Sequence, residues 1–179
     1  MRKLSIVIAS ALLLAASGAF AQGMAPAAAG PTDPQIAHIV VTANQVDIDA
    51  GKLAESQGTN KDVKAFGKQM VTDHTGVNQQ AVALVTKLKV TPEDNPTSQS
   101  LKAGGEANVK NLTGLKGAAF DKAYIDHEVE YHVQVLDAID KVLIPNAKNA
   151  ELKALIVKVR PAFVGHLEHA KMIQATLAK

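Results

Sequence analysis

The chain has 179 residues, no cysteine and no tryptophan, and aromatic residues make up only 3% of it. Its 19 Lys and Arg stand against 17 Asp and Glu. Two of the basic residues, Arg2 and Lys3, lie in a segment that we expect to be removed, which leaves 17 against 17 and a neutral mature chain. A neutral chain lacks the basic face of a nucleic-acid-binding protein. The absence of cysteine excludes a disulfide framework and a cysteine-linked lipid anchor.

The N-terminus has the three parts of a secretory signal peptide. Arg2 and Lys3 precede an apolar run over 4–14, and residues 19–21 (Ala-Phe-Ala) form a cleavage site. The apolar run is too short to span a bilayer. We therefore expect residues 1–21 to be cleaved, which predicts a periplasmic protein, with association at the outer membrane as a further option and no membrane-spanning segment. Residues 22–33 are rich in Ala, Gly and Pro and predict a flexible linker before one domain over 34–179.

Four segments of that domain carry apolar residues at helical spacing, over 34–57, 61–89, 120–143 and 149–178. Pro34, after Thr32 and Asp33, is typical of a helix start. Pro145 marks the end of the third segment. Pro161, inside the fourth, predicts a bend or a break. No segment shows the alternation of a strand, so the expected fold class is all-α.

The connection over 92–117 is long and polar, with a short helix expected over 98–112 that Gly104 and Gly105 would weaken. A helix over 61–89 is about 40 Å long, and about 25 residues suffice to return along it. The second and third main helices could therefore run parallel. This predicts two helical hairpins joined by a long crossover, which is the connectivity of a ferritin-like four-helix bundle.

Polar residues fall on the apolar faces of all four predicted helices, each near its helix's middle. A lone polar group there is costly unless a partner satisfies it. These candidate site residues are Asp47, His74, Glu128, His132 and His166. Three further residues, Asp73, His127 and His169, flank them.

Two interpretations of this set stay open. Imidazole and carboxylate groups on facing helices can bind one transition-metal ion, with Asp73 or Tyr131 accepting from the unused ring N–H groups. A di-iron site is disfavoured because no inward Glu-x-x-His exists and Glu128 and His132 are spaced i, i+4. Alternatively, neutral histidines pair with the buried carboxyl groups in a network that only specifies the fold. A third possibility, that histidines are only partly solvated at helix edges, is expected first for His38 and His127.

Three segments carry a resemblance to a known family: VKAFGKQMVTDH over 63–74, GAAFDKAYIDHEVEYH over 117–132 and RPAFVGHLEHA over 160–170. They resemble the exported bacterial ferritin-like family whose members are described as a domain of unknown function, or as predicted outer-membrane or periplasmic proteins. The resemblance spans about 35–177 and implies a ferritin-like four-helix bundle in the cell envelope, without implying an activity.

The family's recurring residues can be placed on this chain. Its Asp-His pair falls on Asp73 and His74, and its later histidines fall on His132 and His166. The chain departs from the family at Glu128, where Met is common, and at Tyr131, where an acidic residue is common.

No phosphate-binding loop, nucleophile elbow, dinucleotide-binding or zinc-protease motif occurs in the chain. The sequence therefore assigns no reaction and leaves enzymatic activity undecided. Two functions are predicted: an envelope protein that binds one transition-metal ion, or a non-enzymatic structural or interaction module. The expected partners are an envelope protein or a second copy of the chain, and no nucleic acid.

Overall fold

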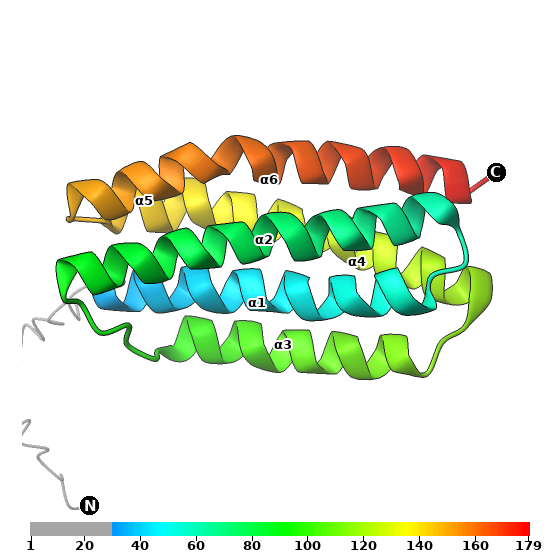
Figure 1. The fold of residues 1–179 in the computed structure, drawn as a ribbon, viewed down its shortest axis with the longest axis horizontal. Helices are drawn as coiled ribbons and strands as arrows, with labels where there is room; N and C mark the ends of the chain where they lie inside the picture. Colours follow the sequence, from blue (N-terminus) through cyan, green and yellow to red (C-terminus); the bar gives the residue numbers. More distant parts are fainter. Residues whose placement is uncertain (1–29) are drawn as a thin grey trace, which may run out of the picture.

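The structure is a computed structural model that describes residues 30–179, and over these residues it is helical without any strand. The all-α fold class is thus confirmed (Figure 1). The predicted signal peptide and positions 22–29 of the predicted linker lie outside the described residues. The elements are α1 (Asp33–Gln57), α2 (Lys61–Leu88), α3 (Pro96–Thr113), α4 (Gly117–Ala138), the π-helical turn η1 (Ile139–Leu143), α5 (Ile144–Asn146) and α6 (Ala150–Leu177).

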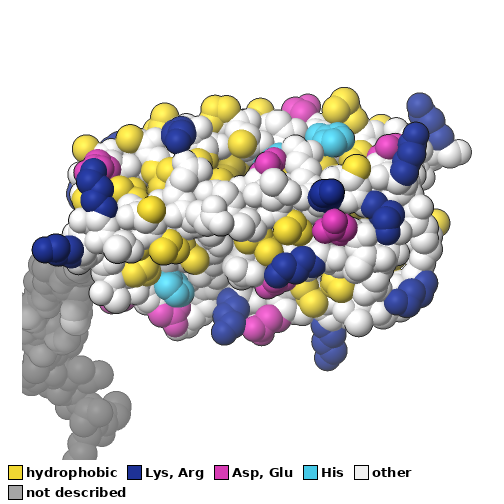
Figure 2. Space-filling model, viewed as in Figure 1, with side chains coloured by type: hydrophobic (Ala, Val, Ile, Leu, Met, Phe, Trp, Pro, Cys, Tyr) yellow, Lys and Arg dark blue, Asp and Glu magenta, His cyan; other side chains and the backbone are white. Residues whose placement is uncertain are grey.

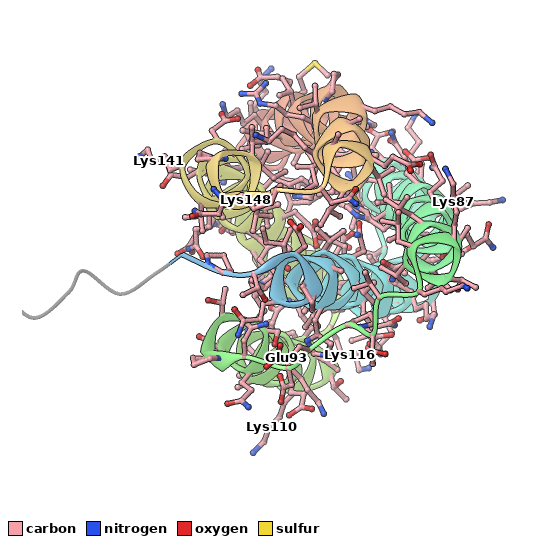
Figure 3. The ribbon with its side chains drawn as sticks, turned by 90° about the vertical axis from the view of Figure 1, so that its left-hand side faces the viewer. Lys87, Glu93, Lys110, Lys116, Lys141 and Lys148 are labelled. Atoms are coloured by element: carbon pink, nitrogen blue, oxygen red, sulfur yellow. The ribbon has the colours of Figure 1, made fainter. Side chains whose placement is uncertain are left out.

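Helices α1, α2, α4 and α6 lie side by side around a common interior, and α3 packs on the outside of α1 (Figures 1 and 3). Helices α1 and α2 form one hairpin, and α4 and α6 form the other. Helix α3 runs back along the length of the molecule, so α2 and α4 point in the same direction (Figure 1). The end-on view shows Lys87, Lys110 and Lys141 pointing away from the interior (Figure 3).

The predicted crossover is a longer helix than the sequence indicated. Asn95 and Ser98 cap α3 reciprocally, and Pro96 occupies its first turn. The glycine pair does not interrupt it. A Cβ on Gly105 would lie 2.7 Å from Cγ2 of Val46, so the missing side chain is what lets α3 approach α1 closely.

One helix boundary needs correction, and one of the two alternatives predicted at Pro161 is excluded. The third predicted helix starts earlier, at Gly117, and continues through η1 to Asn146; the π turn comes just before Pro145, which has no N–H to donate. Pro161 does not break α6. Both Pro161 and Val157, whose carbonyl loses its helical donor, are exposed, so water can satisfy that carbonyl.

A carboxylate from each hairpin caps the turn of the other. Asp121, at the start of α4, accepts from the backbone N–H groups of Thr59 (2.9 Å) and Asn60 (2.8 Å) and from the Thr59 hydroxyl. Asp33, at the start of α1, accepts from the backbone N–H groups of Lys148 (2.8 Å) and Asn149 (2.9 Å). The two hairpins are therefore tied together at both ends of the molecule.

The core consists of two apolar clusters separated by a polar layer. One cluster lies around Ile36, Val135 and Ile156, and the other around Phe66, Tyr124 and Ala170. The polar layer crosses the middle of all four inner helices and consists of Asn44, Asp47, His74, Glu128, His132 and His166. Among the described helices, none combines the length and apolarity that crossing a membrane requires.

Candidate metal centre

Three histidines from three helices meet in the polar layer: His74 from α2, His132 from α4 and His166 from α6. Their ring centroids lie 5.1 to 5.8 Å apart, and none of the three residues is more than 3% exposed. Each ring offers one nitrogen, and these three nitrogens lie within 4.8 Å of one another. The phenyl ring of Phe163 lies against all three imidazoles.

Two of the rings are anchored through Nδ1. His74 Nδ1 lies 2.7 Å from Oδ1 of Asn44, and His132 Nδ1 lies 2.9 Å from the backbone oxygen of Glu128. Each partner atom is an acceptor, so Nδ1 carries the proton in both rings. This assigns the tautomer and leaves Nε2 of both histidines with a lone pair.

The third ring is anchored through its other nitrogen. His166 Nε2 lies 2.9 Å from Oδ2 of Asp73, which therefore accepts its proton and leaves Nδ1 with a lone pair. The Asp73 side chain is 41% exposed, whereas that of His166 is 4% exposed. Asp73 thus reaches from the surface into the layer.

The three remaining ring nitrogens have no hydrogen-bond partner among the described residues: His74 Nε2, His132 Nε2 and His166 Nδ1. Because the other nitrogen of each ring is held by its acceptor, we infer that these three lone pairs face one another. Nitrogen ligands of a tetrahedral ion at about 2.1 Å lie about 3.4 Å apart. Closing the rings by roughly 1 Å would bring three lone pairs onto one ion.

Two carboxyl groups lie behind this triad. Oδ2 of Asp47 is 3.5 Å from Nδ1 of His74, and Oε2 of Glu128 is 3.5 Å from Nδ1 of His132. Both residues are at most 1% exposed, and their four carboxyl oxygens lack a hydrogen-bond partner within residues 30–179. Asp47, Glu128 and His132 also offer ligand atoms within 4.8 Å of one another. Each triad histidine therefore has a carboxyl group near its anchored nitrogen.

Burial sets the protonation of the layer. It raises the pKa of Glu128 to about 8, and burial together with the neighbouring Glu128 raises the pKa of Asp47 well above its usual value. Two adjoining buried carboxyl groups cannot both be ionised cheaply, so the pair holds at least one proton at neutral pH.

The pKa values of the three histidines shift in the opposite direction. Burial, with the nearby His166, lowers the pKa of His132 to about 4. Burial and the two neighbouring imidazoles lower the pKa of His74 well below its usual value, and burial also lowers that of His166. The triad is therefore neutral at pH 7, which is the form in which imidazole binds metals.

The five predicted site residues all lie in one layer, but they do not converge on one point. His74, His132 and His166 form the triad, and Asp47 and Glu128 stand behind it. Asp73 accepts from His166, as expected for an outer partner. Tyr131 does not play that part: its hydroxyl donates to the backbone oxygen of Ala43 at 3.1 Å.

The flanking histidines lie outside the triad. His127 stacks on Tyr131, and His169 lies beside Gln69, with 3.1 Å between its Nδ1 and the Gln69 Oε1. His38 lies half-buried near Asp94, away from the polar layer.

Sequence reasoning missed Asn44, the acceptor for His74. Asn44 precedes Asp47 by three residues, so both lie on the same face of α1, and this spacing was a signal that could have found it. It also missed the hydroxyl of Tyr124, which is fully buried and has no hydrogen-bond partner in the part of the chain that the structure describes.

The comparisons with known proteins give a family without an assigned activity. The profile of the family described as "Domain of unknown function (DUF4142)" matches residues 18–173. No curated protein and no solved structure matches the chain.

Proposed function

The chain belongs to the family described as Domain of unknown function (DUF4142), and we propose that it binds one divalent first-row transition-metal ion through His74, His132 and His166. One observation carries the proposal: three buried imidazoles offer nitrogens within 4.8 Å of one another, and each ring has one anchored nitrogen and one without a hydrogen-bond partner among the described residues. A buried polar atom without a partner is costly, and three such atoms together are accounted for by a shared cation.

Asp47 and Glu128 supply the balancing charge in this proposal. Three neutral imidazoles leave the charge of a divalent ion uncompensated in a buried layer. Carboxylates behind metal-binding histidines orient the rings and raise their basicity. Both carboxyl groups lie 3.5 Å from a ring nitrogen of the triad, so an ion at the triad would favour their ionised form.

Three imidazole ligands leave a coordination position free. This is the donor set of catalytic rather than structural zinc sites, and imidazole also suits Cu, Fe and Ni. A water molecule or a small exogenous ligand would occupy the fourth position. The residues of the chain that hold the three rings in place are Asn44, Asp73 and Glu128.

We further propose that the domain is a ferritin-like four-helix bundle that works in the periplasm or at the outer membrane. Two hairpins, a crossover along the outside and a polar layer in mid-bundle support the fold assignment. The signal-peptide pattern over 1–21 supports the location.

Elemental analysis of the mature protein, purified without a metal-affinity tag, tests the metal site. The wild-type protein is compared with the His74→Ala/His132→Ala double variant and with His127→Ala, a matched control that removes a half-buried histidine from the same helix as His132. Circular dichroism checks that each variant keeps its helices. We expect about one equivalent of metal in the wild type and in the control, and none in the double variant.

A wild-type protein that arrives without metal and takes up no Zn, Cu, Fe or Ni on titration would overturn the proposal. The polar layer would then be a network that specifies the helix register, and the search for function would turn to partner proteins in the envelope.

A further inference from the structure

A small cavity lies in the apolar cluster on one side of the polar layer. Its volume is about 30 Å³, and its wall is built from α1, α2, α4, η1 and α6, with Val77, Val135 and Ile156 among the lining residues. Two further lining residues, Ile139 and Leu143, are the first and last residues of the π-helical turn η1. Such turns inside α-helices are frequent at functional sites. The cavity therefore lies at an irregular point of the bundle.

The lining offers little to a water molecule. Asn44 is the polar exception among the described residues that line the cavity, and both ends of its amide are engaged. Its Oδ1 lies 2.7 Å from Nδ1 of His74, and its Nδ2 donates to the backbone oxygen of Val40 at 2.7 Å. A buried water molecule makes about three hydrogen bonds, whereas a cavity with an apolar lining stays dry and takes up apolar molecules. The lining therefore favours an uncharged, apolar occupant.

The same cavity adjoins the histidine triad. The ring of Phe163 forms part of the cavity wall, and its centroid lies 5.0 Å from that of His74 and 6.1 Å from those of the other two triad rings. Asn44 forms another part of the wall, and it also anchors His74. A molecule in the cavity is thus separated from the imidazoles by single side chains.

Size limits the occupant further. A volume of about 30 Å³ is the share of one water molecule in the liquid, so the cavity has room for about two heavy atoms. We propose that the cavity binds an uncharged diatomic molecule, the class of dioxygen, nitric oxide and carbon monoxide, beside the triad. Phe163 then contacts both the bound molecule and the imidazoles. The site does not require the metal ion, so it goes beyond the function proposed above.

Binding of so small a ligand is weak. Two heavy atoms support a dissociation constant no tighter than about 6 mM, so the test uses dissolved gas under pressure. Dioxygen is the probe because it is paramagnetic and speeds the NMR relaxation of protons near it. Dioxygen also reaches exposed methyl groups: hydrophobic side chains are spread over the surface in Figure 2, and Val82 is 53% exposed. Val82 therefore serves as the internal reference for contact with dissolved gas.

Methyl relaxation of the metal-free protein is measured under dioxygen and under dinitrogen, which is diamagnetic, at the same pressure. We expect the increase under dioxygen at the buried Val135 and Ile156 to equal or exceed that at Val82, and the ring protons of Phe163 to show a similar increase. Ile125, which is fully buried in the other apolar cluster, should show little increase. An increase at Val135 and Ile156 no larger than that at Ile125 would overturn the proposal.

Filling the cavity gives the matched comparison. Val135→Ile adds one methylene at the cavity wall, whereas Val129→Ile adds it on the same helix beside the other apolar cluster. The first variant should lower the increase at Val77 and Ile156 to the level of Ile125, and the second should leave it unchanged. An unchanged increase in Val135→Ile would overturn the proposal.

Circular dichroism checks that both variants keep their helices, and Val77→Ile, read out at Ile156, replaces Val135→Ile if that variant does not fold. Because the measurement uses the metal-free protein, the two proposals fail separately. Absence of dioxygen from the cavity leaves the metal triad intact, and absence of metal binding leaves the cavity site intact.

Discussion

Three side-chain carboxyl groups are buried within residues 30–179, and they differ in what surrounds them. Asp121 is 2% exposed and accepts three hydrogen bonds from Thr59 and Asn60. Asp47 and Glu128 are at most 1% exposed, and none of their oxygens has a hydrogen-bond partner within the described part of the chain. The same chemical group is thus satisfied at the end of the molecule and unsatisfied in its middle.

The difference separates a structural role from a functional one. A buried carboxylate with three donors stabilises the fold, because its charge is compensated by dipoles that would otherwise be unpaired. A buried carboxyl pair whose only donor is the proton that it holds is costly to the fold. Such a cost is typical of residues kept for a site, since perturbed pKa values cluster where chemistry or binding occurs.

Removing the satisfied carboxylate should have the largest effect on stability. Asp121→Ala leaves the N–H groups of Thr59 and Asn60 without their acceptor and unties the α1–α2 turn from α4. We expect a loss of about 3–4 kcal/mol in the free energy of unfolding. Urea unfolding followed by circular dichroism measures it, and the exposed Asp49→Ala serves as a control that should change stability by less than about 0.5 kcal/mol.

Removing the unsatisfied pair should act in the opposite direction. Asp47→Leu/Glu128→Met replaces the two buried acids with apolar side chains of similar volume, and we expect the metal-free protein to become about 2 kcal/mol more stable. Metal affinity should fall about 10–100-fold, because the balancing charge behind His74 and His132 is lost. A double variant that is destabilised as strongly as Asp121→Ala would show that Asp47 and Glu128, like Asp121, stabilise the fold.

The comparison also predicts a pH dependence for the metal-free protein. Folding raises the pKa of Glu128 from 4.5 to about 8, so the folded state binds its proton more tightly, and this stabilisation is lost as the pH rises through about 8. Folding lowers the pKa of His132 from 6.5 to about 4, so its contribution is lost only as the pH falls from 6.5 toward 4.

Between pH 6.5 and pH 8 the carboxyl pair therefore dominates the pH dependence of the free energy of unfolding. The free energy of unfolding of the metal-free protein should fall by about 1–2 kcal/mol over this interval. Thermal unfolding at the two pH values measures the change. Glu128→Gln should flatten the profile, and a wild-type profile that rises over the same interval would contradict the assignment of a proton to the pair.

The helices could be predicted from the sequence because apolar spacing and capping residues are local signals. The crossover direction followed from the length of the connection alone. The length of α3 was underestimated because glycine disfavours a helix when only the local sequence is considered. At Gly105 the missing side chain instead allows contact with Val46, which is 59 residues away in the sequence. The effect of Pro161 likewise depends on which side of α6 faces water, a tertiary property.

The members of the polar layer could be predicted, since each interrupts an apolar face. Their roles could not. Whether Asp47 points at an ion or stands behind His74 depends on a few ångströms of helix offset, which a 3.6-residue period does not fix. Which nitrogen of each histidine ring carries the proton depends on acceptors such as Asn44 and Asp73, which lie on a different helix from the histidine that each one contacts.

The smallest expected effect comes from the second turn cap, and it tests whether burial decides what a satisfied carboxylate contributes. Asp33 accepts from the backbone N–H groups of Lys148 and Asn149 much as Asp121 accepts at the other turn, but Asp33 is only half-buried. Water can replace Asp33 at these donors, so Asp33→Ala should cost about 1 kcal/mol, a typical value for an exposed cap. Urea unfolding of Asp33→Ala and Asp121→Ala under the same conditions gives the ratio of the two losses in the free energy of unfolding. Each carboxylate accepts from two backbone N–H groups, so equal losses would mean that these backbone donors, rather than burial, set the contribution. The contrast with Asp47 and Glu128 would then depend on donors alone.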